Sequence, residues 1–189
     1  MTTLAPILST RYFPRTAAWL RDLFLITLSA LFVAAFAQIR IPLPFTPVPL
    51  TGQTFAVLLV GAALGSKRGA ASLVLYTLMG TVGLPFFAGG ASGLAYMSGP
   101  TLGYLGGFVI AAYVVGLLAE RGLERSVRTS LGPFLIGTLV IYLFGVGWLA
   151  FLFGVKQALA LGVLPFLVGD AIKLVLAALA LPGAWTLAK

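Results

Sequence analysis

The stretch from Gly69 to Ala119 reads GAASLVLYTLMGTVGLPFFAGGASGLAYMSGPTLGYLGGFVIAAYVVGLLA and contains no charged residue. A transmembrane helix needs about 20 apolar residues, so this stretch is too long for one span and long enough for two. Glycine-rich punctuation between Phe87 and Pro100 supplies the break between them. The stretch therefore predicts two transmembrane helices, at about 69–87 and 101–119, joined by a loop at 88–100.

The composition of the whole chain is that of an integral membrane protein. Of its 189 residues, 60% are hydrophobic and 8% are charged, whereas ordinary soluble domains carry about 25% charged residues. The sequence has neither Cys nor His and has only four Asp and Glu. It therefore lacks the ligands of the usual transition-metal sites and most groups for acid–base catalysis. We expect no metal, no cofactor and no enzyme activity.

Charges and prolines divide the rest of the chain into four more uncharged runs. Together with the first two helices they make residues 1–189 a single all-α domain of six transmembrane helices. The four further spans are expected at about 23–39, 52–66, 131–153 and 164–187.

Two segments outside these spans differ from them in composition. Residues 1–21 form a basic arm that lacks the features of a cleaved signal peptide. The segment from Ile41 to Thr51 contains four prolines, each of which removes a backbone donor and biases its predecessor toward extended geometry. This segment is therefore predicted to be a stiff, apolar loop, referred to below as the proline loop.

The positive charges predict the orientation in the membrane. Outside the spans, the loop and terminal segments on the side of the two termini hold Arg11, Arg15, Arg21, Lys67, Arg68, Arg121, Arg125, Arg128 and Lys189, and the opposite side holds Arg40 and Lys156. Because Lys and Arg concentrate on the cytoplasmic side, both termini are expected there, and the loops at 41–51 and 88–100 outside. This distribution accounts for the positive charge without a nucleic-acid partner.

Asp170 and Lys173 are the two charges that fall well inside a predicted span. Each costs about 2.5–3.5 kcal/mol at the bilayer centre on the insertion scale, so they should face the bundle interior. Their i, i+3 spacing places them on one helix face, where they can pair. The pair is either a structural ion pair or a polar binding centre. We favour a binding centre for a small neutral polar head such as a urea or amide group.

Other candidate binding residues lie in and beside the outer loops. Gln53 and Thr54 add an amide and a hydroxyl group after the proline loop, although the same residues also suit an ordinary helix start. Phe45 and Val48 give the proline loop an apolar underside, with which it could act as a lid over a ligand.

Four more candidates lie in or beside the glycine loop at 88–100. Tyr96 and Tyr104 are candidate walls of an apolar pocket, the alternative being aromatic anchors at the membrane interface. Gly89 and Gly90 either let the backbone approach a ligand closely or form a flexible turn.

The first span contains the pattern Ala30-Leu31-Phe32-Val33-Ala34, with small residues four positions apart. Such a pattern lets another helix approach closely, either a neighbouring helix of the same chain or a partner protein.

Six stretches, taken in order, resemble the BioY family, the biotin-specific substrate-binding component of energy-coupling factor transporters. The resemblance covers nearly the whole chain after the basic arm. It departs from the family pattern at Leu102, where a second Gly is common, and at Val168, where Pro is common. The stretches are Gln38–Pro44, Pro47–Phe55, Leu64–Gly69, Gly83–Gly90, Gly99–Phe108 and Leu164–Lys173.

The resemblance implies a function and a set of partners. The family binds biotin from the outside with its last three helices and outer loops, in the plasma membrane of prokaryotes. It implies that the first three helices, through Ala30 and Ala34, meet a transmembrane coupling protein driven by two cytoplasmic ATPase subunits. Arg40 and Lys173 are the alternative partners of the biotin carboxylate. The competing hypothesis is a standalone facilitator or ion-linked carrier that uses Asp170.

The predicted orientation can be tested by labelling a single cysteine. Because the chain contains no Cys, the variant Ser92→Cys carries one thiol, in a loop predicted to face outward. A membrane-impermeant maleimide should label it in intact cells. Labelling that occurs only after the cytoplasmic side is exposed would reverse the orientation.

Overall fold

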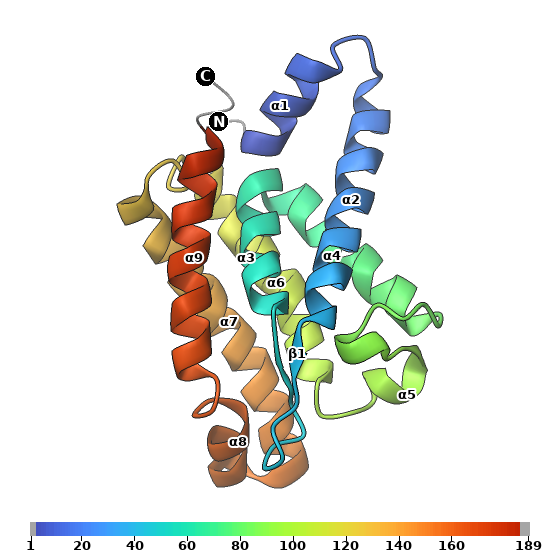
Figure 1. Cartoon of the computed structure of the whole chain (residues 1–189), viewed down its shortest axis with the longest axis vertical. Coiled ribbons are helices and arrows are strands. Elements are labelled where there is room, and N and C mark those ends of the chain that lie inside the picture. The colour runs from blue at the N-terminus through green and yellow to red at the C-terminus, as the bar shows by residue number, and fades with distance from the viewer. Residues whose placement is uncertain (1–2, 186–189) are drawn as a thin grey trace.

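The computed structural model describes residues 3–185, which form a bundle of helices with one small β hairpin (Figure 1). Helices are expected here because a bilayer offers no water to the backbone, so each spanning segment must satisfy its own polar groups. The long helices are α2 (Ala18–Gln38), α3 (Gln53–Leu64), α4 (Ser66–Thr81), α6 (Leu102–Ala119), α7 (Val127–Phe153) and α9 (Leu167–Trp185). The short elements are α1 (Leu4–Tyr12), β1 (Arg40–Ile41), β2 (Leu50–Thr51), the 3-10 turn η1 (Ala88–Gly90), α5 (Gly93–Met97) and α8 (Val155–Gly162).

Within the described residues, α2, α6, α7 and α9 are the helices long and apolar enough to cross a membrane. The other two expected spans coincide with α3 and α4, of 12 and 16 residues. At 1.5 Å per residue these helices are about 18 and 24 Å long, against about 30 Å of hydrocarbon. They meet at Gly65, whose positive φ of 85° ends α3 and starts α4.

The helix boundaries differ from the expected ones where charge alone was used to place them. α2 begins at Ala18 instead of position 23 and contains Asp22, whose carboxylate pairs with Arg68 at 2.7 Å. α7 begins at Val127 instead of position 131, because the Ser126 side chain accepts a hydrogen bond from the backbone N–H of Thr129. A charge that is paired, or a polar residue that caps a helix, does not interrupt it.

Three short helices lie outside the expected spans. α1 lies in the basic arm, where its residue Leu4 is buried in the core. α5 lies in the glycine loop, and α8 lies in the turn between the last two expected spans. Residues 1–2 and 186–187, which the predictions included, and Lys189 lie outside the described part of the chain.

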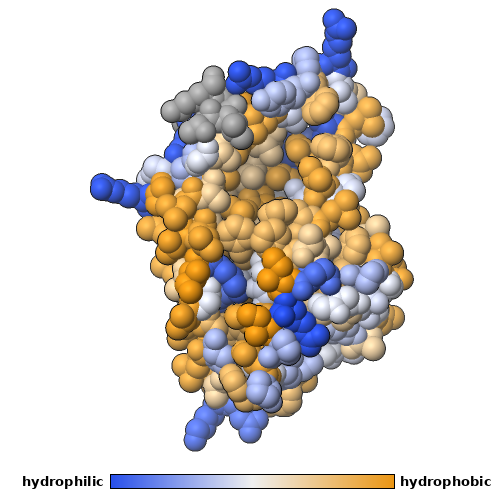
Figure 2. Space-filling model, viewed as in Figure 1, coloured by the Kyte–Doolittle hydropathy of each residue, from blue (hydrophilic) through white to orange (hydrophobic). Residues whose placement is uncertain are grey.

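The bundle is organised around α3 and α6. α6 packs against α3, α4 and α7, while α2 covers α3 and α4, and α9 covers α3 and α7. Small residues permit the closest approach: a Cβ on Gly61 of α3 would lie 2.7 Å from the Ala112 carbonyl oxygen of α6. Hydrophobic residues cover most of the face seen in Figure 2, whereas hydrophilic ones project at its ends and at one side and also form a group on the lower half of the face.

The hairpin marks one end of the bundle. β1 and β2 pair antiparallel, with Arg40 opposite Thr51 and Ile41 opposite Leu50, so the proline loop forms the hairpin's tip. Figure 1 places this tip and α8 at one end of the molecule, and α1 and the last turn of α9 at the other.

The close contact between α3 and α6 predicts an effect on stability. The variant Gly61→Ala should lower the free energy of unfolding by about 1–3 kcal/mol, because the added methyl group pushes α3 away from Ala112. Gly106→Ala is the matched control, since a Cβ there meets nothing within 4 Å. Thermal unfolding of the purified proteins in detergent measures both. Equal midpoints for the two variants would contradict the importance of this contact.

Candidate functional site

A pocket lies near the end of the bundle that carries the hairpin, where α3, α6 and α9 begin. Its empty volume is about 500 Å³, with the opening to solvent included. Six of the predicted binding residues line it: Gln53, Thr54, Tyr96, Tyr104, Asp170 and Lys173. The remaining lining residues are Val48, Pro49, Thr51, Thr101, Leu105, Phe108, Ile141, Tyr142 and Phe166.

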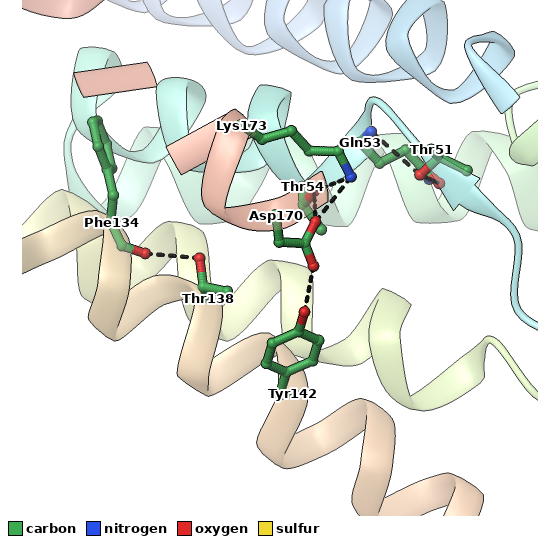
Figure 3. A network of polar contacts seen from close by, with 8 residues as sticks. All are labelled: Thr51, Gln53, Thr54, Phe134, Thr138, Tyr142, Asp170 and Lys173. Atoms are coloured by element: carbon green, nitrogen blue, oxygen red, sulfur yellow. Dashed lines mark hydrogen bonds and ion pairs between the residues drawn. The ribbon is translucent and has the colours of Figure 1, made fainter. Parts of the chain in front are cut away.

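Asp170 is the centre of a hydrogen-bond network that joins three helices (Figure 3). Its Oδ1 accepts from the Lys173 ammonium at 2.8 Å and from the Thr54 hydroxyl at 3.1 Å. Its Oδ2 accepts from the Tyr142 hydroxyl at 2.5 Å. Lys173 also donates to the Thr54 oxygen at 3.1 Å. Residues of α3, α7 and α9 therefore converge on one carboxylate.

The two charges of this network are largely removed from solvent. The side chain of Asp170 is 8% exposed and that of Lys173 is 17% exposed. A single uncompensated charge at such a place costs several kcal/mol, so the two groups neutralise each other. Asp170 also lies in the first turn of α9, where the helix dipole favours a negative charge.

The network leaves part of its hydrogen-bonding capacity unused. A carboxylate offers about four lone-pair positions, and an ammonium group offers three N–H donors. Two donors reach Asp170 Oδ1 and one reaches Oδ2, while two acceptors face the Lys173 ammonium. Within residues 3–185, one acceptor position on Asp170 Oδ2 and one donor on Lys173 remain. This combination suits a neutral group in which an N–H stands beside a C=O.

Hydrogen bonds to two other side chains of the protein hold the Gln53 amide in place. Its Nε2 donates to the Tyr76 hydroxyl oxygen at 2.6 Å, and its Oε1 accepts from the Thr51 hydroxyl at 2.9 Å. These bonds tie the start of α3 to α4 and to the hairpin. They fix the position of Thr54, the next residue, whose hydroxyl bonds to Asp170.

Neighbouring groups also hold the two tyrosines of the pocket wall. The Tyr104 hydroxyl donates to the Gly162 carbonyl oxygen at 2.7 Å. The Tyr96 ring stacks on Phe87, with 4.9 Å between the ring centroids. Both rings are therefore fixed before a ligand arrives.

Four predicted binding residues do not line this pocket. Phe45 is 61% exposed, and the buried side chain of Val48, from the same loop, lines the pocket instead. Arg40 packs on the glycine loop, where a Cβ at Gly89 would lie 2.7 Å from the Arg40 Nη1 atom. Gly89 and Gly90 both have positive φ, at 69° and 79°. The glycine conformation thus accommodates an arginine side chain of the same protein.

Tyr142 is the functional candidate that sequence reasoning missed. From the sequence alone it resembles the aromatic residues that anchor a helix at the membrane interface or pack between helices. Its place inside the long helix α7 is the signal that could have separated it from an anchor. A tyrosine hydroxyl far from both membrane surfaces needs a partner within the protein.

Ala30 and Ala34 lie inside the chain's own core. They are 2% and 7% exposed and belong to a cluster that includes residues of α3 and α4. The small residues of α2 therefore face the bundle in this structure.

Comparisons with known proteins point to one family. The profile of the BioY family matches residues 7–189. A probable biotin transporter BioY of Pyrococcus horikoshii is 44% identical over 149 residues, which cover 78% of this chain and 88% of that protein. A biotin transporter BioY of Rhizobium etli is 39% identical over 168 residues, which cover 84% of this chain and 90% of that protein.

A solved structure agrees with the sequence relatives. The crystal structure of the S-component for biotin from an ECF-type ABC transporter matches with a TM-score of 0.76 and 25% sequence identity. The match covers 88% of this chain and 92% of that chain.

The role of Tyr142 in the network predicts its contribution to stability. Tyr142→Phe removes one donor from a buried carboxylate, so the free energy of unfolding should fall by about 1.5–3 kcal/mol. Tyr113→Phe is the control, because Tyr113 is 42% exposed. Thermal unfolding in detergent compares the two. If Tyr142→Phe unfolds at the same temperature as the control variant, the hydroxyl does not support Asp170.

Proposed function

The chain belongs to the BioY family, and on this premise we propose that it captures biotin from outside the membrane as the substrate-binding component of an energy-coupling factor transporter. It is a transport protein and not an enzyme. Its biotin-named relatives and the structural match to a biotin S-component support this assignment.

The unused hydrogen-bonding positions at Asp170 and Lys173 carry the proposal. The bicyclic head of biotin contains a cyclic urea, in which an N–H donor stands beside a carbonyl oxygen. We assign the N–H to the remaining acceptor position on Asp170 Oδ2 and the carbonyl to the remaining donor of Lys173. Binding in this pose keeps the ion pair intact. Thr54 and Tyr142 position the carboxylate.

The rest of the pocket suits the apolar part of biotin. Val48, Leu105, Phe108, Ile141 and Phe166 contribute hydrocarbon surface beside the polar centre. The thioether ring and the alkyl chain of biotin can be removed from water against these side chains, which is favourable in proportion to the apolar area buried. The tyrosine rings at 96 and 104 complete the wall.

The biotin carboxylate needs a separate partner, because Lys173 is already used by the ureido group in this pose. Arg40 is our candidate, since it lies on the hairpin beside Gly89, at the end of the bundle near which the pocket lies. The Arg40 side chain packs against the backbone of Gly89, and Phe45 belongs to the exposed outer surface of the loop.

The membrane arrangement completes the proposal. We propose that the single domain crosses the plasma membrane of a prokaryote six times, with α3 and α4 as its two short spans. Both termini would be cytoplasmic, and the hairpin and α8 would face outward. The charge distribution of the sequence and the position of α1 opposite the hairpin support this orientation.

A coupling protein and two cytoplasmic ATPase subunits would supply the energy. We propose that α2 carries the contact with the coupling protein through its exposed apolar residues, among them Phe24, Leu28 and Leu31. Ala30 and Ala34, which are buried, would set the close packing of α2 on the bundle and thereby fix the position of this surface.

Isothermal titration of purified variants tests the binding centre. Asp170→Asn weakens the acceptor and leaves Lys173 without its counter-charge, and Lys173→Ala strands Asp170. Each should lose about 3–5 kcal/mol of binding free energy, which is more than a hundredfold in affinity. Asp22→Asn is the control, because Asp22 pairs with Arg68 in another part of the bundle. Folded Asp170→Asn and Lys173→Ala proteins with unchanged biotin affinity would exclude this site.

A further inference from the structure

The carboxyl end of α8 receives hydrogen bonds from two different parts of the protein. The last carbonyl groups of a helix have no partner within the helix. Here the Leu161 carbonyl accepts from the Thr46 hydroxyl of the proline loop at 2.7 Å. The next carbonyl, that of Gly162, accepts from the Tyr104 hydroxyl of the pocket wall at 2.7 Å. Two adjacent carbonyls thus join the loop to the pocket.

Thr46 connects this helix end to the part of the loop that closes the pocket. Its hydroxyl oxygen also accepts a hydrogen bond from the backbone N–H of Val48 at 3.2 Å. The side chain of Val48 is 6% exposed and lines the pocket, as does Pro49. One hydroxyl therefore fixes the turn that places Val48 and ties that turn to α8.

The residues on the other side of the carboxyl end of α8 also line the pocket. Tyr104 lines it, and so does Phe166, which follows α8 by four positions. The Phe166 carbonyl accepts from the backbone N–H of Asp170 at 2.8 Å. The segment from α8 to the start of α9 is thus in contact with the binding centre at one end and with the proline loop at the other.

We propose that the carboxyl end of α8 is a latch for the proline loop, in which Thr46 is a positioning residue that sets the rate of ligand release. The loop covers the pocket while its hydroxyl is bonded to Leu161, and a ligand leaves when this bond breaks. Tyr104 holds the receiving end of the latch in position. This inference rests on the proposed binding of biotin and assigns a role to α8.

The prolines explain why a single bond can have this effect. Four prolines restrict the loop, so it loses little conformational entropy when it closes. The hairpin hydrogen bonds hold its base, where Arg40 pairs with Thr51. The bond from Thr46 holds its tip against α8.

The dissociation rate of biotin tests the latch. Thr46→Val removes the hydroxyl and keeps the shape, and it should release bound radiolabelled biotin about 3- to 10-fold faster in a chase with unlabelled biotin. Thr46→Ser retains a hydroxyl and should restore release to the wild-type rate. Tyr104→Phe should also accelerate release. The double variant should be less affected than the product of the two single effects, because both bonds act through the same helix end.

A second measurement does not need the ligand. A spin label on Phe45→Cys, which replaces an exposed side chain of the loop, should become more mobile when Thr46→Val is added and should not change with Thr46→Ser. If wild-type protein fails to bind biotin, the proposed function fails, while this mobility still tests the latch. Wild-type label mobility together with a wild-type release rate in Thr46→Val would overturn it, and multiplicative effects of Thr46→Val and Tyr104→Phe would refute the link through α8.

Discussion

The need to compensate one buried carboxylate determines how the interior of this protein is arranged. An ionised group without water must obtain its counter-charge and its hydrogen bonds from the same chain. Asp170 obtains the charge from Lys173 on its own helix and hydroxyl donors from Thr54 on α3 and Tyr142 on α7. Each hydroxyl reaches Asp170 at one depth of its helix in the bundle and at one rotation of that helix about its axis. Asp170 therefore selects one arrangement from the many that apolar helices alone would permit.

Small residues and a short helix make that arrangement possible. Gly61 lets α3 approach the backbone of α6 at Ala112, which brings the start of α3 toward the pocket. α3 is only 12 residues long. The space next to its first residue, Gln53, is therefore not filled by helix. The proline loop occupies this space, where Val48 and Pro49 line the pocket. The binding site thus exists because α3 begins short of the end of the bundle that carries the hairpin.

The sequence identified the residues whose chemistry is rare in a membrane and missed those whose role depends on position. Asp170 and Lys173 could be predicted as a pair, because their charges inside an apolar span require partners. The place of Tyr142 inside α7 separates it from an interfacial anchor, but its contact with Asp170 could not be predicted without knowing which way α7 is turned. The proline loop has no regular alternation, so the sequence could not show that Val48 faces the pocket and Phe45 faces away. Paired Asp22 likewise lies inside a helix that its charge was expected to precede.

The neutrality of the pair explains which ligand the pocket can select. Asp170 and Lys173 together carry no net charge, so the empty pocket leaves no charge uncompensated, and a ligand need not bring a counter-ion. An anionic head would attract Lys173 and repel Asp170, and a cationic head would do the reverse. A neutral group with an adjacent donor and acceptor uses both remaining positions without disturbing the pair. A charge on such a ligand must therefore lie at a distance from the head, beyond an apolar section. Biotin has this construction, because its alkyl chain separates the ureido ring from the carboxylate.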